Sequence, residues 1–139
     1  MRRLTVLAVA LCLTAFMPVW AQAQTTPAAS APAPDGRFVV FFQEWSAALD
    51  APAQAVIATA AKAALADPKA SVLVSGTADP IGSARANELV SALRAQMVTD
   101  ALIAAGVPAE RISQRALGAT EYALNALESR RASIAISAK

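Results

Sequence analysis

Four short runs rich in β-branched and aromatic residues alternate with three segments of helical periodicity between residues 37 and 137. Runs of this kind predict strands, whereas apolar residues spaced three and four positions apart predict helices. The regular alternation predicts one sheet with helices packed on it, a small α/β sandwich with the order β-α-β-α-β-α-β. The predicted strands are Phe38–Phe42, Val72–Val74, Ile112–Leu117 and Ala132–Ser137.

Capping residues and prolines set the bounds of the predicted helices. The first begins after Asp50, a favourable N-cap, and ends at Asp67, which a proline follows. The second begins after Ser83 and ends at Gly106, and a short third helix covers Thr120–Ser129. One face of the second helix is apolar, and we expect this face to pack on the sheet. It comprises Ala86, Leu89, Val90, Leu93, Met97, Ala101, Leu102 and Ala105.

The first 23 residues have the form of an export signal. Arg2 and Arg3 precede an apolar run over residues 4–20, and the small-x-small sequence ending at Ala23 follows. This pattern predicts a signal peptide over residues 1–23 that is cleaved after Ala23. An uncleaved anchor, a twin-arginine signal and a lipid on Cys12 are less favoured alternatives, since the apolar run is short and Cys12 lies early, after a leucine.

Removal of this leader changes the charge balance. The sequence has 12 lysines and arginines against 10 acidic residues, and two of the arginines lie in the leader. The exported chain is therefore formally neutral, which argues against nucleic acid as a partner. Residues 24–36 are rich in proline and alanine and predict an extended linker, so we expect one domain over residues 37–137.

Several classes of chemistry are excluded by composition. The chain has no histidine, and its single cysteine lies in the predicted leader. Zinc sites, Ser-His-Asp or Cys-His catalysis and disulfide frameworks are therefore excluded. The sequence also contains no G-x-S-x-G motif and no lysine of a phosphate-binding loop. We accordingly expect a protein that is not an enzyme and that needs no metal or cofactor.

A motif spans the loop before the second helix and the first half of that helix, and reads GTADPIGSARANELVSALRA from Gly76 to Ala95. It resembles the signature of the OmpA-like C-terminal domain family, which includes OmpA, Pal and MotB proteins. The resemblance extends over about residues 38–136 and implies a mixed sheet. The motif positions in register are Gly76, Asp79, Gly82, Asn87, Ser91, Arg94 and Ala95.

The resemblance implies that the domain grips the diaminopimelate side chain of peptidoglycan without cutting it. Asp79 would accept hydrogen bonds from the ammonium group of the ligand and Arg94 would bind its carboxylate, with N–H donors from the loop after the first strand. The implied setting is the periplasm, in association with the outer membrane, with envelope proteins as further partners. The residues given supporting roles are Asn87, Ser91, Gly82 and Arg131.

Other readings of these residues remain open. Taken singly, Asp79 is a typical turn former and Arg94 a typical solvated residue on the polar face of a helix. Because neither residue belongs to the apolar faces of the predicted elements, alanine at either position is expected to abolish ligand binding while hardly changing folding. The aromatic run at residues 38–42 is expected in the core, and Trp45 in the core or at a rim. Arg130 and Arg131 either support the site or lie at an edge of the domain.

The sequence also departs from the family pattern. Thr77 and Ala78 replace a common histidine or tyrosine and a threonine, Ser129 replaces an asparagine, and Gln43-Glu44 stands where aspartates are common. Residue 86 is alanine rather than a frequent tyrosine, and the segment 118–130 is short. The alternative function is therefore a divergent periplasmic domain that has lost wall binding and serves protein interaction.

Overall fold

A computed structural model describes residues 36–119 and 126–138 of the chain. The predicted signal peptide, nearly all of the predicted linker and the first part of the third predicted helix lie outside these residues. In chain order, the elements are β1 (Arg37–Phe41), α1 (Ala51–Ala66), β2 (Ser71–Ala78), α2 (Ala84–Ala104), a 3-10 turn (Ala109–Arg111), β3 (Ile112–Ala119), α3 (Ala126–Ser129) and β4 (Arg131–Ser137).

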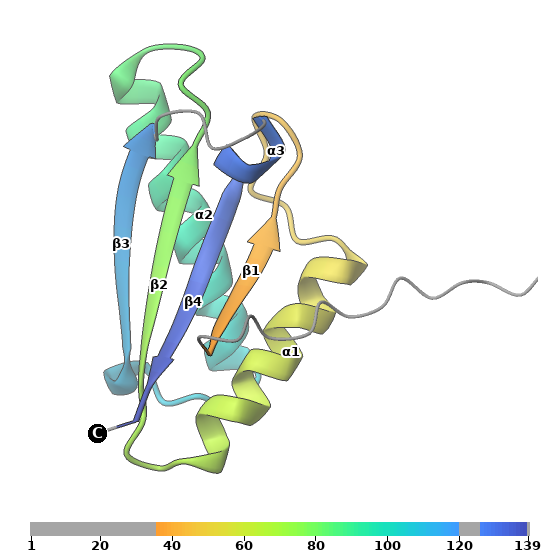
Figure 1. Cartoon of the computed structure of the whole chain (residues 1–139), viewed down its shortest axis with the longest axis vertical. Coiled ribbons are helices and arrows are strands. Elements are labelled where there is room, and N and C mark those ends of the chain that lie inside the picture. Colours follow the sequence, from red (N-terminus) through yellow and green to blue (C-terminus); the bar gives the residue numbers. More distant parts are fainter. Residues whose placement is uncertain (1–35, 120–125, 139) are drawn as a thin grey trace, which may run out of the picture.

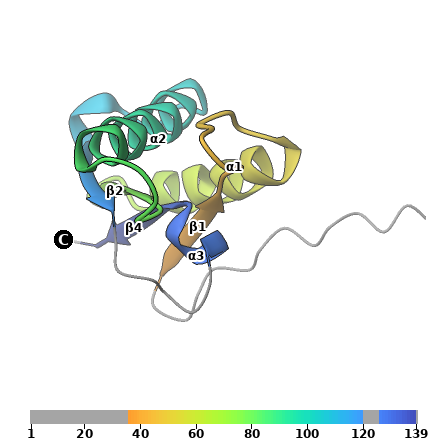
Figure 2. The ribbon, with the colours of Figure 1, turned by 90° about the horizontal axis from the view of Figure 1, so that it is seen from above.

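The four strands form one mixed sheet in the order β1-β4-β2-β3 (Figure 1). β4 pairs antiparallel with β1 on one side and with β2 on the other, whereas β2 and β3 are parallel. Parallel neighbours need a crossover, and α2 provides it. Both α1 and α2 lie on the same face of the sheet (Figure 2). The predicted α/β sandwich with a mixed sheet is confirmed.

The core lies between this face and the two helices. Alternate residues of the strands point into it, so Phe38 and Val40 of β1 are buried whereas Phe41 is exposed. The expectation that Phe41 belongs to the core is therefore wrong, because the strand alternation turns it to the other face. α1 begins at its predicted cap, where the Asp50 carboxylate accepts a 2.9 Å hydrogen bond from the amide of Ala53.

α2 is rotated relative to the sequence prediction. Of the face expected to pack, Leu102 is buried, but Leu89, Leu93, Met97 and Ala105 are exposed. The side that packs on the sheet carries three polar side chains among apolar ones. Two of them, Ser91 and Arg94, are tolerated there because they find hydrogen-bond partners inside the fold. The buried residues of α2 are Asn87, Ser91, Arg94, Ala95, Val98 and Leu102.

β2 continues past Gly76, where the sequence predicted a loop. A Cβ atom at Gly76 would lie 2.0 Å from the carbonyl oxygen of Ser91, so the glycine lets α2 approach the strand closely. The parallel pairing with β3 shifts register between Gly76 and Ala78, and the chain then turns at Asp79 into α2. None of the helices in the described ranges is long and apolar enough to cross a bilayer.

Candidate functional site

Three chain segments meet where β2 ends and α2 begins. They are the loop after β1, the turn at residues 79–83, and the residues just before β4. These three segments lie far apart in the sequence, and the order of the strands in the sheet brings them together (Figure 1). Every charged residue of the candidate site belongs to one of these segments or to the helix that follows the turn.

Arg94 occupies the floor of this region and is only 1% exposed. Its Nε atom donates to the Ser46 carbonyl at 2.9 Å, Nη1 to the Thr77 carbonyl at 2.9 Å and Nη2 to a third carbonyl, that of Gln43, at 3.2 Å. Its guanidinium carbon lies 5.3 Å from the centroid of the Phe42 ring, a cation–π distance. Arg94 therefore ties the loop after β1 to the end of β2.

The surroundings of Arg94 shift the pKa of its guanidinium group in both directions. Burial lowers the pKa of the guanidinium from its ordinary value, the Asp79 carboxylate raises it, and the positive charge of Arg130 lowers it. Arginine starts from so high a pKa that it stays protonated at neutral pH. The hydrogen bonds of Arg94, one of them buried and two partly buried, argue against the expectation that truncating this side chain hardly affects folding.

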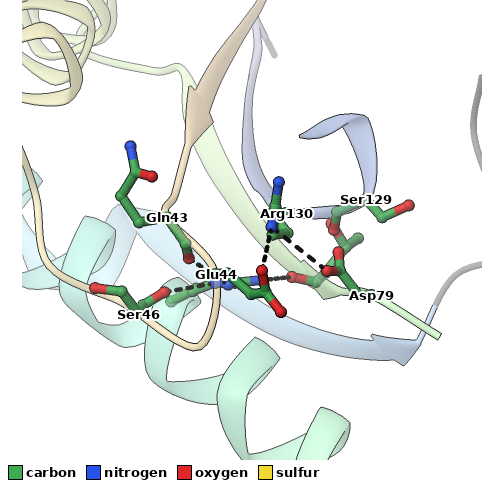
Figure 3. A network of polar contacts seen from close by, with 8 residues as sticks. Gln43, Glu44, Ser46, Asp79, Ser129 and Arg130 are labelled. Atoms are coloured by element: carbon green, nitrogen blue, oxygen red, sulfur yellow. Dashed lines mark hydrogen bonds and ion pairs between the residues drawn. The ribbon is translucent and has the colours of Figure 1, made fainter. Parts of the chain in front are cut away.

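Asp79 lies beside Arg94 and is 9% exposed. Its Oδ2 atom is 3.9 Å from Nη1 of Arg130, and the same nitrogen is 3.4 Å from Oε2 of Glu44 (Figure 3). The other carboxylate oxygen of Asp79, Oδ1, is buried and has no hydrogen-bond partner among the described residues, nor has Nε of Arg130. A buried acceptor and a buried donor thus stand unpaired within one charged cluster.

A small pocket opens next to these charges; its cavity volume is about 10 Å³, within about 210 Å³ of free space that includes open solvent. Asp79, Asn87 and Arg94 supply its polar lining. The apolar lining comes from Trp45, Ile81, Val90 and Ala78. The sequence-predicted pair, Asp79 and Arg94, therefore shares one pocket, and its wall combines both charges with an apolar side.

Trp45 forms the rim of the pocket and is more than half exposed. Its backbone has a φ of 52°, which is unusual for a bulky residue. The tip of its ring lies so close to Gly82 that a Cβ atom there would be 2.7 Å from it, and Gly82 itself has a φ of 100°. Of the two sequence readings of Trp45, core or rim, the structure supports the rim.

The residues predicted to be supporting have different surroundings. Asn87 lines the pocket. Ser91 lies deeper, where its hydroxyl donates to the Glu88 carbonyl and accepts a 3.0 Å hydrogen bond from the amide of Gly118 in β3. The main-chain oxygen of Arg131 accepts from the Thr77 hydroxyl at 3.0 Å. The supporting role of the Arg131 side chain stays a prediction.

Arg130 is the most informative neighbour of Asp79, and its role could not be decided from the sequence. Arg130, and not a residue of the Gly76–Ala95 motif, provides the positive charge nearest to the Asp79 carboxylate. Glu44 was singled out only as a departure from the family pattern, and the apolar wall at Ile81 and Val90 was not anticipated. Only the pairing of two adjacent arginines before the last strand hinted at this role. No group of acidic side chains in the described ranges is arranged to hold a metal ion.

Chemically, this arrangement suits a small group that carries both charges. An ammonium group alone would gain from Asp79 but be repelled by Arg94 and Arg130. A carboxylate alone would be attracted by Arg94 and Arg130 but repelled by Asp79. A zwitterion can place its ammonium on the free Oδ1 of Asp79 and its carboxylate toward the guanidinium groups, so that each buried charge has a partner.

Known proteins share both the sequence and the fold of this region. A model of the OmpA family matches residues 41–133 of the chain. Outer membrane protein A of Serratia odorifera is 47% identical over 53 residues, which are 37% of this chain and 22% of that protein. Its counterpart from Escherichia coli O157:H7 is 51% identical over 53 residues, 37% of this chain and 15% of that protein. The match thus spans less than a quarter of either relative.

Solved structures extend the similarity to the whole fold. The peptidoglycan-associated lipoprotein from Burkholderia pseudomallei has a TM-score of 0.66 at 23% identity, over 72% of this chain and 90% of that chain. The C-terminal domain of Helicobacter pylori MotB gives 0.65 at 24% identity, over 73% and 84% of the two chains. The OmpA-like domain of FopA1 from Francisella tularensis gives 0.66 at 22% identity, over 73% and 72%.

Proposed function

Because this chain belongs to the OmpA family, whose OmpA-like domains are binding modules of the cell envelope and not enzymes, we propose that it binds peptidoglycan non-covalently. The ligand we propose is the zwitterionic end of the diaminopimelate side chain in the stem peptide. Binding would tether the protein to the wall. The observation that carries this proposal is the buried, unpartnered Oδ1 of Asp79 in a pocket that also contains Arg94.

The ammonium half of the ligand is assigned to Asp79. A buried carboxylate oxygen without a hydrogen-bond donor is destabilising by about 1–3 kcal/mol, and an ammonium group removes that penalty while adding a charge-assisted bond. Nη1 of Arg130 approaches only the other oxygen, and at 3.9 Å, so Oδ1 is open to a second donor. Asp79 can therefore receive the ligand without first giving up its internal contact.

The carboxylate half is assigned to Arg94, with Arg130 as a second donor. A guanidinium carries five N–H groups, and the three carbonyls hydrogen-bonded to Arg94 use three of them. Two remain for a ligand, in a side chain that is already held in place and so loses little entropy on binding. Nε of Arg130 is a further buried donor without a partner in the described part of the chain.

Sedimentation with isolated sacculi tests this proposal. We expect the wild-type protein to sediment with diaminopimelate-type sacculi, Asp79→Asn to stay in the supernatant, and free diaminopimelate to compete. Glu110→Gln is the matched control, because it removes one exposed carboxylate from the 3-10 turn, far from the pocket in sequence. Wild-type protein that does not sediment, or Asp79→Asn that sediments normally, would contradict the proposal.

A comparison of two types of peptidoglycan provides a second and sharper test. Lysine-type peptidoglycan offers an ammonium group without the neighbouring carboxylate. If both charges of the ligand are read, the protein should bind lysine-type sacculi at least about 10-fold more weakly, since one charge-assisted hydrogen bond to a buried group is worth about 1.5–3 kcal/mol. Equal binding to both walls would leave the ammonium as the sole determinant and remove the assigned role of the arginines.

The proposed location is the periplasm, in association with the outer membrane, and it rests on the leader sequence. Cleavage after Ala23 would give a mature chain that begins at Gln24 and carries no cysteine. Intact-mass measurement of the exported protein checks this. A mass that retains residues 1–23, or that includes a lipid on Cys12, would contradict it.

Protein interaction is the second candidate function, and one specific observation favours it. Large apolar side chains of α2 face solvent, which the fold alone does not require. If wild-type protein fails to bind sacculi of either type, this function becomes the better account of the domain.

A further inference from the structure

The solvent side of α2 carries an apolar surface that is distinct from the pocket. Leu89 and Leu93 are 55% and 54% exposed, and Met97 is 36% exposed. None of the three lines the pocket. They are spaced four residues apart, so they form one continuous row along the helix. We call this row the α2 stripe (Leu89, Leu93 and Met97).

The α2 stripe is conspicuous because the opposite side of the same helix is the polar one. Arg94, Ser91 and Asn87 point into the fold, while two leucines and a methionine point out of it. Exposed apolar side chains occur singly on most proteins, but a row of them on one helix is typical of an interface. The α2 stripe therefore needs a covering surface that the described part of the chain does not provide.

The charges around the α2 stripe indicate what that surface is. Arg85 lies one turn before the stripe and Asp100 just after it, and both are exposed, although Arg85 also pairs with Glu88 at 3.4 Å and Asp100 accepts a hydrogen bond from Gln96 at 2.8 Å. They are 15 positions apart, or about 22 Å along a helix, and Leu93 lies near their midpoint. An antiparallel second copy of α2, related by a two-fold axis at Leu93, would place each Arg85 beside the Asp100 of the other copy.

We propose that this protein forms a symmetric dimer through the α2 stripe, with the two α2 helices antiparallel. In this arrangement Leu93 meets its own counterpart and Leu89 meets Met97, twice, as the self-complementarity of a two-fold interface requires. Antiparallel helices also oppose their dipoles favourably. A lipid surface fits less well, because the charges beside the stripe are of both signs and include Glu88 and Asp100.

The α2 stripe adjoins the ligand pocket at Val90, three residues before Leu93, but contributes none of the residues that line it. Each copy would keep Asp79 and Arg94 available, so a dimer would present two wall-binding sites. Two sites on one assembly bind a repetitive polymer more tightly than one site does. The dimer and the proposed ligand are nevertheless independent claims, because the α2 stripe shares no residue with the pocket.

Sedimentation equilibrium of the exported protein tests the dimer. We expect a mass that rises from monomer to dimer with concentration, whereas Leu93→Asp should stay monomeric up to about 0.5 mM, close to the weak end of specific association. Leu65→Asp is the matched control, because Leu65 is a 44% exposed leucine on α1, outside the stripe. Circular dichroism should show native helix content in both variants, since both leucines face solvent.

Charge reversal tests the proposed orientation. Arg85→Asp alone and Asp100→Arg alone should each weaken the dimer, by about 2- to 5-fold for exposed pairs. The double variant should recover wild-type association, because both partners are reversed together. A double variant no better than the single ones would overturn the antiparallel arrangement.

Cross-linking provides a direct measure of the axis. In the chain that begins at Gln24, which carries no native cysteine, Leu93→Cys should form a disulfide dimer on mild oxidation and Leu65→Cys should not. The proposal is overturned by a wild-type protein that is monomeric throughout, by a dimer that survives Leu93→Asp, or by a monomer that uses the stripe to bind lipid vesicles.

Discussion

Two arginines hold opposite ends of this domain in nearly the same way. Arg111, the last residue of the 3-10 turn before β3, donates to the carbonyls of Ala70, Ala64 and Asp67 at 2.6–2.8 Å. These bonds join the end of α1 to the start of β2. Arg94 likewise donates to three carbonyls, at the other end of β2. In both regions one guanidinium replaces the main-chain donors that an irregular loop lacks.

The two regions differ in what surrounds the guanidinium. Arg111 is half-buried, and no carboxylate forms a salt bridge with it among the described residues. Arg94 is fully buried, lines a pocket and shares it with a carboxylate oxygen that has no partner. Three bonds to carbonyls therefore do not indicate a ligand site by themselves. The unsatisfied acidic group is what distinguishes the proposed binding end from the structural end.

The largest effect should follow from Arg94→Ala, which tests whether the binding end is also structural. We expect it to lower the free energy of unfolding by about 3–5 kcal/mol, because three carbonyls lose their donor and a buried cavity remains. Urea titration followed by circular dichroism measures this. Arg94→Lys should recover part of the stability but not the binding, since an ammonium group cannot reach three separated carbonyls. Unchanged stability in the alanine variant would mean that the three bonds contribute nothing.

Asp79→Asn should separate binding from stability at the same end. Binding to diaminopimelate-type sacculi should fall about 10- to 100-fold, because the amide cannot pair with the ammonium charge. Stability should fall by about 1–3 kcal/mol, less than for Arg94→Ala, since Asp79 is buried but its ion pair with Arg130 is long, at 3.9 Å. The two measurements together would show a residue kept for its ligand. A large loss of stability with normal binding would instead make Asp79 a structural residue like Arg111.

The sequence predicted the order of elements well, because the signals were local. The Asp50 and Ser83 caps accept hydrogen bonds from amides three residues on, and the β-type runs became strands close to the predicted bounds. The strand that was most underestimated, β2, continues through Gly76. Its glycine and small residues were read as a loop because the helix that packs on them is not visible locally.

The orientation of α2 could not be predicted from its own residues. Its apolar stripe is the better packing face by composition, yet Arg94 is the residue that is buried. The carbonyls that accept its hydrogen bonds belong to residues 17, 48 and 51 positions away. Similarly, Arg130 reaches Asp79 only because β4 lies beside β2 in the sheet. Distant partners of this kind are set by topology, which a spacing argument does not contain.

Arg111→Ala sharpens the comparison from the structural end. We expect a loss of about 1–3 kcal/mol in the free energy of unfolding, smaller than for Arg94→Ala because water can reach some of the abandoned carbonyls. Affinity for sacculi, measured on the folded fraction, should equal that of the wild type. If this variant also lost binding, the two ends of the sheet would be coupled and the division between a structural and a binding arginine would fail.

The smallest effect should come from Arg130→Gln, and it concerns selectivity. Arg130 is partly exposed and its contact with Glu44 is on the surface, so stability should change by less than about 1 kcal/mol. Binding to diaminopimelate-type sacculi should weaken about 2- to 5-fold, because one donor to the carboxylate is lost. Binding to lysine-type sacculi should improve, since an ammonium group approaching Asp79 would no longer meet a competing positive charge. The ratio of the two affinities is therefore the quantity to measure, and it should move toward one. A ratio that stays at the wild-type value would mean that Arg94 alone binds the ligand carboxylate, and that Arg130, like Arg111, has only a structural role.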